Sequence, residues 1–419
     1  MDPDPGVAML NAAGTGGLEQ RYRFWSGWYT LFIGLIVFAG ALRTLKAPNG
    51  WTPGDWLINY EGGFVRRGLS GEALLLLARV THLPLMPVGV MAPVLFYGLL
   101  YLAVWRLCQR TSWSLWVVAA LVSPATLAFP VLDLTGGYRK ELLYLTGLAG
   151  LLLLLERSTT KDAALSAYLF VVCTISVLCH EGLLVFLPYY AGALLLGFRD
   201  VRRAVLVAIP AVLGVGFAFA AETRHPGSVG TWKAICTSLG PQNADICSGA
   251  VEYLSYGKEY AHQQVLFYVH QYHYFFFYPL LALLGTLPLA FGFYRLSGYR
   301  ELQRDLSVVL GTAILSAGAS TPLFIYAEDW GRWIYIHLFS VFLLLLFVDW
   351  RRQSDPRMHE ELAPRGTAVQ RRWKAVVVLI YAISWNIPHY GNYPKKGYFN
   401  VPMHLLKQYI DNKRAAKTL

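Results

Sequence analysis

Charged residues are scarce in this sequence. Of its 419 residues only 15% are charged, whereas 55% are hydrophobic and the mean hydropathy is +0.41. Soluble domains carry roughly 25% charged residues, so the composition excludes an ordinary soluble domain. Apolar runs of helical length recur along the whole chain, which is typical of a polytopic membrane protein. Because spanning helices satisfy their backbone hydrogen bonds internally, we predict an all-α transmembrane helix bundle.

The sequence also lacks the motifs that bind common cofactors. The sequence has no phosphate-binding P-loop, no dinucleotide-binding glycine motif and no Cys/His set with metal-ligand spacing. The pair His180-Glu181 is not a zinc motif, because no second histidine follows at helical spacing. We therefore assign no cofactor and no metal ligand, and the need for a divalent metal ion stays open.

Cysteine is rare, with five in the chain. Cys108, Cys173 and Cys179 lie within or beside apolar runs and are interpreted as packing residues. Cys236 and Cys247 lie in a long polar segment, at a spacing that would close a small ring. Two alternatives stay open for this pair: a disulfide formed in an oxidising compartment, or two free thiols.

The net charge of +11 predicts an orientation rather than a nucleic-acid partner. Basic residues concentrate in short loops between apolar runs, where the positive-inside rule places them in the cytoplasm. Residues 1–27 contain no apolar core of a cleavable signal peptide. We expect them to form a cytoplasmic tail before a first span that is retained.

The apolar runs predict ten or eleven spans within a bundle formed by residues 28–390, followed by a polar tail, 391–419. The run 69–80 is short for a span, which needs about 20 residues, so we expect an interfacial or half-inserted helix there. Two long outer loops, 46–87 and 222–273, are expected. The expected spans are 28–45, 88–105, 113–129, 142–155, 165–178, 183–196, 204–220, 274–293, 306–325, 334–348 and, if the last run crosses, 373–388.

One polar stretch, residues 54–71, stands out against this background. It contains the acids Asp55 and Glu61, the adjacent arginines Arg66 and Arg67, and five glycines. Charge at membrane depth costs about 2.5–3.5 kcal/mol per residue, so this stretch needs water or a polar partner. We interpret it as the floor of a site at the membrane surface.

Three further charged clusters are expected on the same outer face. Arginines offer forked donors to phosphate oxygens, and carboxylates can accept a proton from an attacking hydroxyl. Aromatic rings offer stacking surfaces to sugars, and glycines allow a ligand to approach the backbone closely. The three clusters are Arg139/Lys140/Glu141, His180/Glu181 and Glu328/Asp329/Arg332.

Each cluster also has a purely structural interpretation. Asp55 could cap a helix, the arginines at 66–67 could anchor to lipid headgroups, and residues 139–141 could start a helix with a local ion pair. Residues 180–181 could form a buried polar corner, and 328–332 a self-neutralising turn with an interfacial tryptophan. The functional interpretation depends on the joint placement of all four clusters on one face.

The order of these parts resembles that of the GT-C glycosyltransferases, polytopic enzymes that use polyprenyl-phosphate-linked sugars on the extracytoplasmic face. A first span leaves the cytoplasm, and the outer loop after it carries acids and two helix-like segments. The resemblance implies a catalytic base in that loop, a role that falls on Asp55, with Glu61 as the other candidate. The loop departs from the family pattern because it lacks an Asp-Asp or Glu-x-Asp pair.

The sequence also resembles bacterial surface-polysaccharide membrane proteins, including O-antigen polymerase-type enzymes. Those proteins join lipid-linked glycans outside the inner membrane and use arginines and histidines of outer loops. Arg66, Arg67, Arg139 and Arg332 match that type of site.

We therefore expect a membrane glycosyltransferase of the bacterial inner membrane, with a polyprenyl-linked sugar donor, a glycan or lipid acceptor and membrane lipids as its partners. Asp55 would deprotonate the acceptor hydroxyl, while arginines would offset the growing charge of the leaving phosphate. The expected substrate-binding residues are Arg66, Arg67, Arg139, Lys140, His180, Glu181, Asp329 and Arg332.

Two other functions are considered. A polymerase or ligase would transfer whole oligosaccharides from a polyprenyl pyrophosphate and would depend on the arginines rather than on Asp55. A transporter or flippase of lipid-linked sugars would place charges near the bilayer midplane and show internal repeats. The charges here fall at the ends of the expected spans, which disfavours transport.

Overall fold

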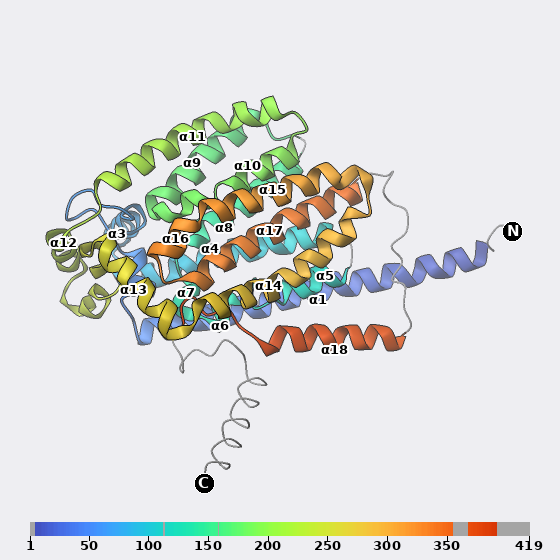
Figure 1. Cartoon of the computed structure of the whole chain (residues 1–419), viewed down its shortest axis with the longest axis horizontal. Helices are drawn as coiled ribbons and strands as arrows, with labels where there is room; N and C mark the ends of the chain where they lie inside the picture. The colour runs from blue at the N-terminus through green and yellow to red at the C-terminus, as the bar shows by residue number, and fades with distance from the viewer. Residues whose placement is uncertain (1–4, 112–113, 158, 355–367, 392–419) are drawn as a thin grey trace, which may run out of the picture.

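The computed structural model describes residues 5–111, 114–157, 159–354 and 368–391, and the statements below concern these residues (Figure 1). The described residues are 81% helical and contain no strand, which confirms the predicted all-α class. The elements are α1 (Pro5–Lys46), α2 (Thr52–Trp56), α3 (Leu69–Thr81), α4 (Leu85–Arg110), α5 (Leu115–Leu121), α6 (Phe129–Leu132), α7 (Leu134–Gly137), α8 (Glu141–Glu156), α9 (Asp162–Cys179), η1 (Glu181–Phe186), α10 (Pro188–Gly197), α11 (Val201–Arg224), α12 (Val229–Leu239), η2 (Pro241–Cys247), η3 (Glu252–Ser255), α13 (Lys258–Tyr272), α14 (Tyr274–Ser297), η4 (Arg300–Leu302), α15 (Gln303–Ala319), α16 (Thr321–Tyr326), α17 (Trp330–Ser354) and α18 (Ala368–Ser384).

Seven helical segments in the described residues are long and apolar enough to cross a membrane. Two shorter apolar segments, Glu181–Gly197 and Trp373–Ser384, accompany them. This is the composition of a multi-pass membrane protein. The seven long segments are Tyr22–Lys46, Leu85–Arg110, Asp162–Cys179, Val201–Arg224, Tyr274–Ser297, Arg300–Tyr326 and Trp330–Gln353.

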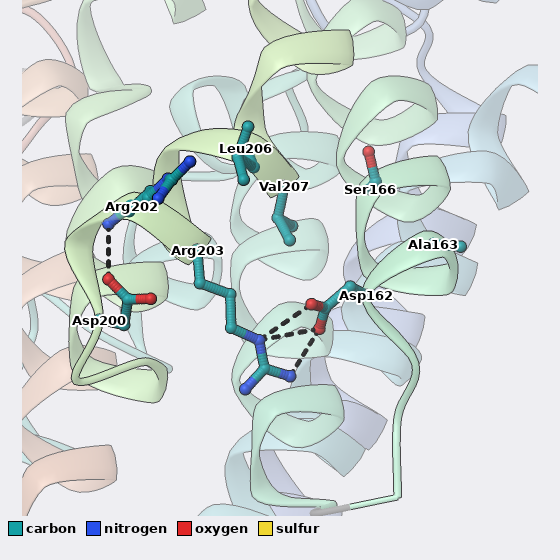
Figure 2. A pocket seen from close by; sticks show the side chains of 8 residues that line it. All are labelled: Asp162, Ala163, Ser166, Asp200, Arg202, Arg203, Leu206 and Val207. Atoms are coloured by element: carbon teal, nitrogen blue, oxygen red, sulfur yellow. Dashed lines mark hydrogen bonds and ion pairs between the residues drawn. The ribbon is translucent and has the colours of Figure 1, made fainter.

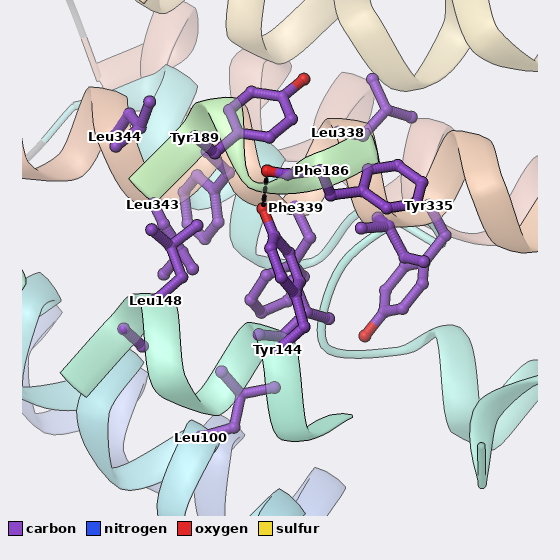
Figure 3. Close-up of a cluster of buried hydrophobic side chains, with 14 of the residues drawn as sticks. Leu100, Tyr144, Leu148, Phe186, Tyr189, Tyr335, Leu338, Phe339, Leu343 and Leu344 are labelled. Atoms are coloured by element: carbon purple, nitrogen blue, oxygen red, sulfur yellow. Dashed lines mark hydrogen bonds between the residues drawn. The ribbon is translucent and has the colours of Figure 1, made fainter. Parts of the chain in front are cut away.

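Helix α17 forms the centre of the bundle. The most apolar part of α17 is 78% buried, whereas the corresponding parts of the other six long segments are 22–44% buried. Its Tyr335 and Phe339 pack in a cluster with Tyr144 of α8 and Phe186 of η1 (Figure 3). The Tyr144 hydroxyl donates a hydrogen bond to the Phe186 carbonyl at 3.0 Å, so the polar group in this core is satisfied.

The surrounding helices expose large apolar side chains outward. On α11 the side chains of Leu213 and Phe217 are 69% and 75% exposed, and Phe275 on α14 is 75% exposed. Soluble proteins rarely present contiguous apolar surfaces of this kind. Lipid-facing helices are expected to do so, because hydrocarbon is their solvent.

The segment 113–129 is a correction to the expected list of spans. Helix α5 covers only Leu115–Leu121, and the short α6 begins at Phe129. Pro124 lies between them and lacks the amide hydrogen that a continuing helix requires. The Thr126 hydroxyl also donates to the Ala120 carbonyl at 2.6 Å, which stabilises the turn. The apolar run therefore turns inside the bundle instead of spanning as one helix.

The N-terminal segment and the second outer loop are more helical than expected, whereas the first outer loop has the short helix that was predicted. Helix α1 is continuous from Pro5, so it includes most of the expected N-terminal tail. Helix α3 matches the short helix expected at 69–80. The predicted loop at 222–273 also folds into helices, namely the end of α11, then α12, η2, η3 and α13.

Residues 229–255, here called the cap, have a small apolar core. Ile235, Ile246 and Val251 pack against Leu57 and Ile58 of the first outer loop. A disulfide joins Cys236 and Cys247, whose Cα atoms are 5.5 Å apart. Of the two alternatives left open by the sequence, the structure therefore has the disulfide. Cys108, Cys173 and Cys179 are buried free thiols, as expected of packing residues.

The last described segment returns to the end of the bundle where α17 begins. The Gly331 amide at the start of α17 donates to the His389 carbonyl at 3.1 Å. The Tyr278 hydroxyl donates to the Pro388 carbonyl at 3.1 Å. The run expected at 373–388 thus leads to this end of the bundle, while the predicted tail lies outside the described residues from 392 onward.

Candidate functional site

The four predicted clusters meet at one end of the bundle, the end that carries α3, α12 and α13 (left in Figure 1). Ion pairs connect the first outer loop directly to residues 139–140 and to Glu181, and Arg332 joins the group through its ion pair with Glu141. The resulting group is called the charged cluster below. It comprises Asp55, Arg66, Arg67, Arg139, Lys140, Glu141, His180, Glu181, Asp329 and Arg332.

Local sequence explains how Asp55 is placed. Pro53 near the start of α2 has the fixed φ that the first turn of a helix favours. The Asn49 side chain accepts hydrogen bonds from the amides of Trp51 and Thr52 at 2.9 and 2.8 Å. Trp56 then anchors the helix, because its indole NH donates to the Tyr138 carbonyl at 2.8 Å. Asp55 therefore points from a short, well-anchored helix toward the segment that begins α8.

Asp55 is fully buried between two cations. Its Oδ2 lies 3.3 Å from Arg139 Nε, and its Oδ1 lies 3.8 Å from Lys140 Nζ. Burial alone would raise the pKa of Asp55, but the charges of Arg139 and Lys140 outweigh it and hold the pKa well below its usual range. Asp55 is thus a carboxylate at neutral pH. It acts in this arrangement as the counter-ion of the two cations.

Lys140 is also fully buried, and burial lowers its pKa from the usual value although Asp55 opposes that shift. Its Nζ donates to the Arg67 carbonyl at 2.7 Å. Lys140 therefore connects the buried acid to the backbone of the adjacent arginine pair.

Arg67 adopts a backbone conformation that is uncommon for a residue with a side chain. Its φ is +66°, and residues other than glycine in this region are held there by surrounding contacts. Its amide donates to Glu222 Oε2 at 2.6 Å, and its guanidinium makes two hydrogen bonds of 2.7 Å to Glu181. The next helix begins close by, and a Cβ on Gly71 would lie 1.9 Å from the Ile58 carbonyl oxygen. Only glycine fits there.

Arg66 and Arg67 share Glu181. Arg66 Nη1 lies 3.5 Å from Glu181 Oε1, farther than either contact of Arg67. The side chains of Arg66, Arg67 and Glu181 are 24%, 22% and 20% exposed. Burial opposes the charge of Glu181, but Arg67 outweighs that effect and holds the pKa well below its usual range. Two cations and one anion thus reach the surface of the cluster together.

Arg332 joins the start of α17 to the start of α8. It is buried, with Nε 3.1 Å from Glu141 Oε1 and Nη2 3.0 Å from Asp329 Oδ2. Its guanidinium also lies 4.4 Å from the centre of the Trp333 ring, within the range of a cation–π contact. The predicted pairing inside residues 328–332 is therefore present, and it extends to Glu141.

His180 is buried and neutral. Burial lowers its pKa well below the usual value, and Arg67 lowers it further. Its Nδ1 accepts from the Gly182 amide at 3.1 Å, which places the ring proton on Nε2. No hydrogen-bond acceptor for Nε2 lies among the described residues. A buried donor in this position is available to a ligand oxygen.

Glu61 is the predicted residue that does not join the charged cluster. Its Oε1 pairs with Arg79 Nη2 of α3 at 2.6 Å, in an exposed position. Its pair resembles an ordinary surface ion pair. The other nine residues proposed for the site lie in the charged cluster, together with Glu141.

Several residues of this end were missed by the sequence reasoning. His389 Nδ1 lies 2.6 Å from Asp133 Oδ2, and the His389 amide donates to the same oxygen at 2.8 Å. Glu222 holds the Arg67 amide. The only signal available for Glu222 was an acid at the end of an apolar run, and for His389 a histidine just after one.

Glu328 belongs to the fourth predicted cluster but is not among the predicted site residues. It is half-buried beside Asp329. Burial raises its pKa, and the negative charge of Asp329 raises it further, to about 8. A carboxylic acid that titrates near neutral pH can donate and accept protons under physiological conditions.

Aromatic rings form a series beside the charged cluster. The Trp51 and Tyr253 ring centres are 5.6 Å apart, and Tyr253 is followed by Tyr256 and Tyr260 at 5.6 and 5.9 Å. The guanidinium of Arg139 lies 5.4 Å from the centre of the Trp51 ring. The series thus extends from a residue of the charged cluster to the exposed Tyr260.

In the described part of the chain, no group of three His, Cys, Asp or Glu side chains is placed to hold a metal ion. The arrangement combines forked cation donors, a buried carboxylate and an acid that titrates near neutral pH, and this combination suits recognition of an anionic ligand with proton transfer. Comparisons with known protein families, with curated proteins and with solved structures find no match for this chain.

Proposed function

We propose that this protein is a membrane glycosyltransferase that moves a sugar from a polyprenyl-phosphate-linked donor to a glycan or lipid acceptor. The observation that carries the proposal is the placement of Arg66 and Arg67 at the exposed side of the charged cluster, where they share Glu181 alone as an ion-pair partner within the described residues. One positive charge is left over at a surface between helix ends. A phosphate there would receive forked hydrogen bonds from arginine.

The buried part of the charged cluster supports the same role. Arg139, Lys140 and Arg332 are more deeply buried than Arg66 and Arg67, and they are held in place by Asp55, Glu141 and Asp329. Charges fixed in advance and shielded from water stabilise a developing anion more strongly than charges that must reorganise. Here the developing anion would be the leaving phosphate.

Two acids are candidates for the proton acceptor. Asp55 is the candidate implied by the family resemblance, and it is ionised, but its side chain is fully buried and lies against two cations. Glu328 is half-buried, and its pKa of about 8 is close to the value that suits a general base at neutral pH. The phosphate of the donor would compete with Asp55 for Arg139 and Lys140, and this competition would free the Asp55 carboxylate.

The aromatic series supports a sugar acceptor. Trp51, Tyr253, Tyr256 and Tyr260 present amphipathic rings along a path that ends at Arg139. Binding sites for organic ligands are lined by aromatic side chains with a few well-placed polar groups. Sugar rings stack on such surfaces through their C–H faces.

We place the charged cluster on the extracytoplasmic face of a bacterial inner membrane. The Cys236–Cys247 disulfide lies in the cap at this end, and disulfides persist in oxidising compartments. The other end carries Arg106, Arg110 and Arg157 at helix termini, the bias of a cytoplasmic face.

The proposal is tested by complementation in cells that lack the gene, with surface glycan resolved on a gel and protein levels measured in the same samples. We expect Arg66→Ala to reduce product formation about 10²- to 10³-fold, the usual loss for one charge-stabilising donor. Arg79→Ala is the matched control, because Arg79 pairs with Glu61 away from the charged cluster. If Arg66→Ala, Asp55→Asn and Glu328→Gln all give wild-type glycan, the proposed function is wrong.

A polymerase or ligase acting on a polyprenyl-pyrophosphate oligosaccharide is the second candidate. The complete burial of Asp55 against Arg139 and Lys140 favours it, because such a carboxylate need not touch the substrate. Two variants distinguish this function from the glycosyltransferase. A polymerase or ligase would still form product in Asp55→Asn at normal protein levels, but it would lose product in Arg66→Ala.

A further inference from the structure

A cavity lies at the opposite end of the bundle, between α4, α8 and α9. Its volume is about 670 Å³. Arg106 and Arg110 come from the last turns of α4, and Arg157 directly follows α8. Leucines of α4 and α8, including Leu99, Leu102 and Leu153, also line it. One end of the cavity is therefore cationic, and its wall is apolar.

The positive charge of this cavity is not neutralised. Arg110 Nη1 pairs with Glu156 Oε1 at 3.1 Å. Arg106 and Arg157 have no ion-pair partner in the portion of the chain that the structure describes. Three arginines and one glutamate leave a net charge of +2 in the lining.

A second crevice at the same end shows the opposite arrangement (Figure 2). Its volume is about 360 Å³, and it lies between the starts of α9 and α11. There Arg203 makes forked hydrogen bonds to Asp162 at 2.6 and 2.9 Å. Asp162 balances the charge of Arg203, so nothing in this crevice favours the binding of an anion. The cavity at Arg106 has unbalanced positive charge, which does favour an anion.

The surface of α4 continues the apolar wall away from the cationic end. Leu95, Leu99 and Leu102 are exposed, and with Arg106 they are spaced four, three and four residues apart. This spacing places all four on one face of a helix. The face holds a line of exposed leucines that ends in an arginine at the helix terminus.

We propose that this cavity binds an anionic phospholipid, with the headgroup phosphate on Arg106 and Arg157 and an acyl chain along Leu95, Leu99 and Leu102. Basic pockets between helices near the membrane surface are suited to anionic headgroups. The lipid would join α4 to the junction between α8 and α9. This inference stands apart from the proposed glycosyl transfer, since it concerns the other end of the bundle.

The test uses purified, delipidated full-length protein titrated with phosphatidylglycerol, with bound lipid counted by native mass spectrometry. Each arginine near a membrane surface contributes about fivefold to binding of an anionic lipid. We therefore expect Arg106→Gln and Arg157→Gln each to weaken phosphatidylglycerol binding about fivefold. Phosphatidylcholine should bind the wild type and both variants with equal weakness.

Arg300→Gln is the matched control. Arg300 is an exposed arginine of η4, after the end of α14, and it does not line this cavity. It removes one charge from the same end of the bundle and should leave binding within twofold of wild type. The double variant Arg106→Lys/Arg157→Lys keeps the charges and should retain most of the binding, which guards against a variant that merely misfolds.

Two further experiments distinguish binding of a lipid from binding of free phosphate. Leu99→Ala should weaken phosphatidylglycerol binding, and inorganic phosphate at millimolar concentration should fail to displace the lipid. The proposal is wrong if the glutamine variants bind phosphatidylglycerol like wild type, if Arg300→Gln weakens binding as much as they do, or if inorganic phosphate displaces the lipid.

Discussion

Asp55 is a buried charge whose environment makes it costly to remove. A buried ion pair is weak evidence for stability as such, but deleting one partner leaves an uncompensated charge. Arg139 and Lys140 would both lose their shared anion if Asp55 were neutralised. This places Asp55 among the structural supports of the charged cluster, whatever part it takes in chemistry.

We predict that Asp55→Asn lowers the free energy of unfolding by about 3–5 kcal/mol, the usual penalty for breaking a buried pair. Glu61→Gln, which breaks only the exposed pair with Arg79, should cost roughly 0–1 kcal/mol. Chemical unfolding in detergent, with wild type in parallel, measures both changes. Equal effects of the two substitutions would contradict the buried pairing of Asp55.

The raised pKa of Glu328 predicts that the stability of the folded protein decreases as the pH rises. Its pKa of about 8 in the folded protein lies above the ordinary 4.5, so the folded state binds the proton more tightly than the unfolded chain does. Its stabilising contribution is fully present below about pH 4.5 and is lost as the pH rises through about 8. Stability measured from pH 5 to 9 should fall less steeply in Glu328→Gln than in wild type.

In the proposed transfer reaction, ionisation of Glu328 would raise activity while it lowers stability. If Glu328 accepts the proton of the acceptor, the transfer rate rises as Glu328 ionises toward pH 8. Glu328→Gln should remove that rise. A wild-type pH profile in Glu328→Gln would show that another group accepts the proton.

At the residue scale, the sequence identified the charged groups but not their partners. The charges of the stretch 54–71 contrast with its apolar surroundings, and this contrast predicts a polar site there. Nothing in that stretch indicates that Arg67 binds Glu181, or that Glu61 binds Arg79 instead of joining the charged cluster. These pairings depend on how distant helix ends meet, which local sequence does not encode.

At the scale of elements, the cap combines a small apolar core with one disulfide. Its core is shared with the first outer loop, so the cap helps to hold Leu57 and Ile58, which follow Asp55 closely in sequence. A small core alone stabilises weakly, and a covalent link compensates for its size.

We predict that the double variant Cys236→Ser/Cys247→Ser destabilises the cap by about 3 kcal/mol, the value expected for closing a short loop. The sequence separation of the two cysteines is 11. Limited proteolysis should cut the variant faster within 229–255, while the bundle helices keep wild-type protection. Unchanged cleavage of the cap would show that its apolar core is sufficient.

The elements also show what periodicity and composition can reveal. The separate helix at 69–80 was expected because its apolar run is too short to span, and α3 occupies that place. The run 113–129 has span-like composition, yet Pro124 and the hydroxyl of Thr126 turn it. An apolar run therefore indicates burial or membrane contact, but a single proline decides whether it remains one helix.

At the scale of the whole molecule, the two ends of the bundle differ in chemistry. One end holds the charged cluster and the disulfide-linked cap, and the other ends in arginines beside the cavity proposed to bind phospholipid. Apolar composition was sufficient to predict the all-α class. Composition could not identify α17 as the central helix, because the apolar run of α17 is similar in hydropathy to those of the lipid-facing helices.

The proposed orientation predicts a labelling pattern. Gly257, exposed and with open space around it, lies beside the cap, and Gly298 is exposed at the other end. In intact cells a membrane-impermeant maleimide should label Gly257→Cys but not Gly298→Cys. After permeabilisation it should label both. The wild type, whose free thiols are buried, gives the background. The reverse pattern would invert the topology.

The return of residues 385–391 to the charged end has a consequence for biosynthesis. Asp55 and the first outer loop leave the ribosome well before His389, which accepts from Gly331 and contacts Asp133. A chain stopped before residue 385 lacks the segment that seats the first turn of α17. This end of the bundle can therefore close only after all the helices from α1 to α18 have been synthesised.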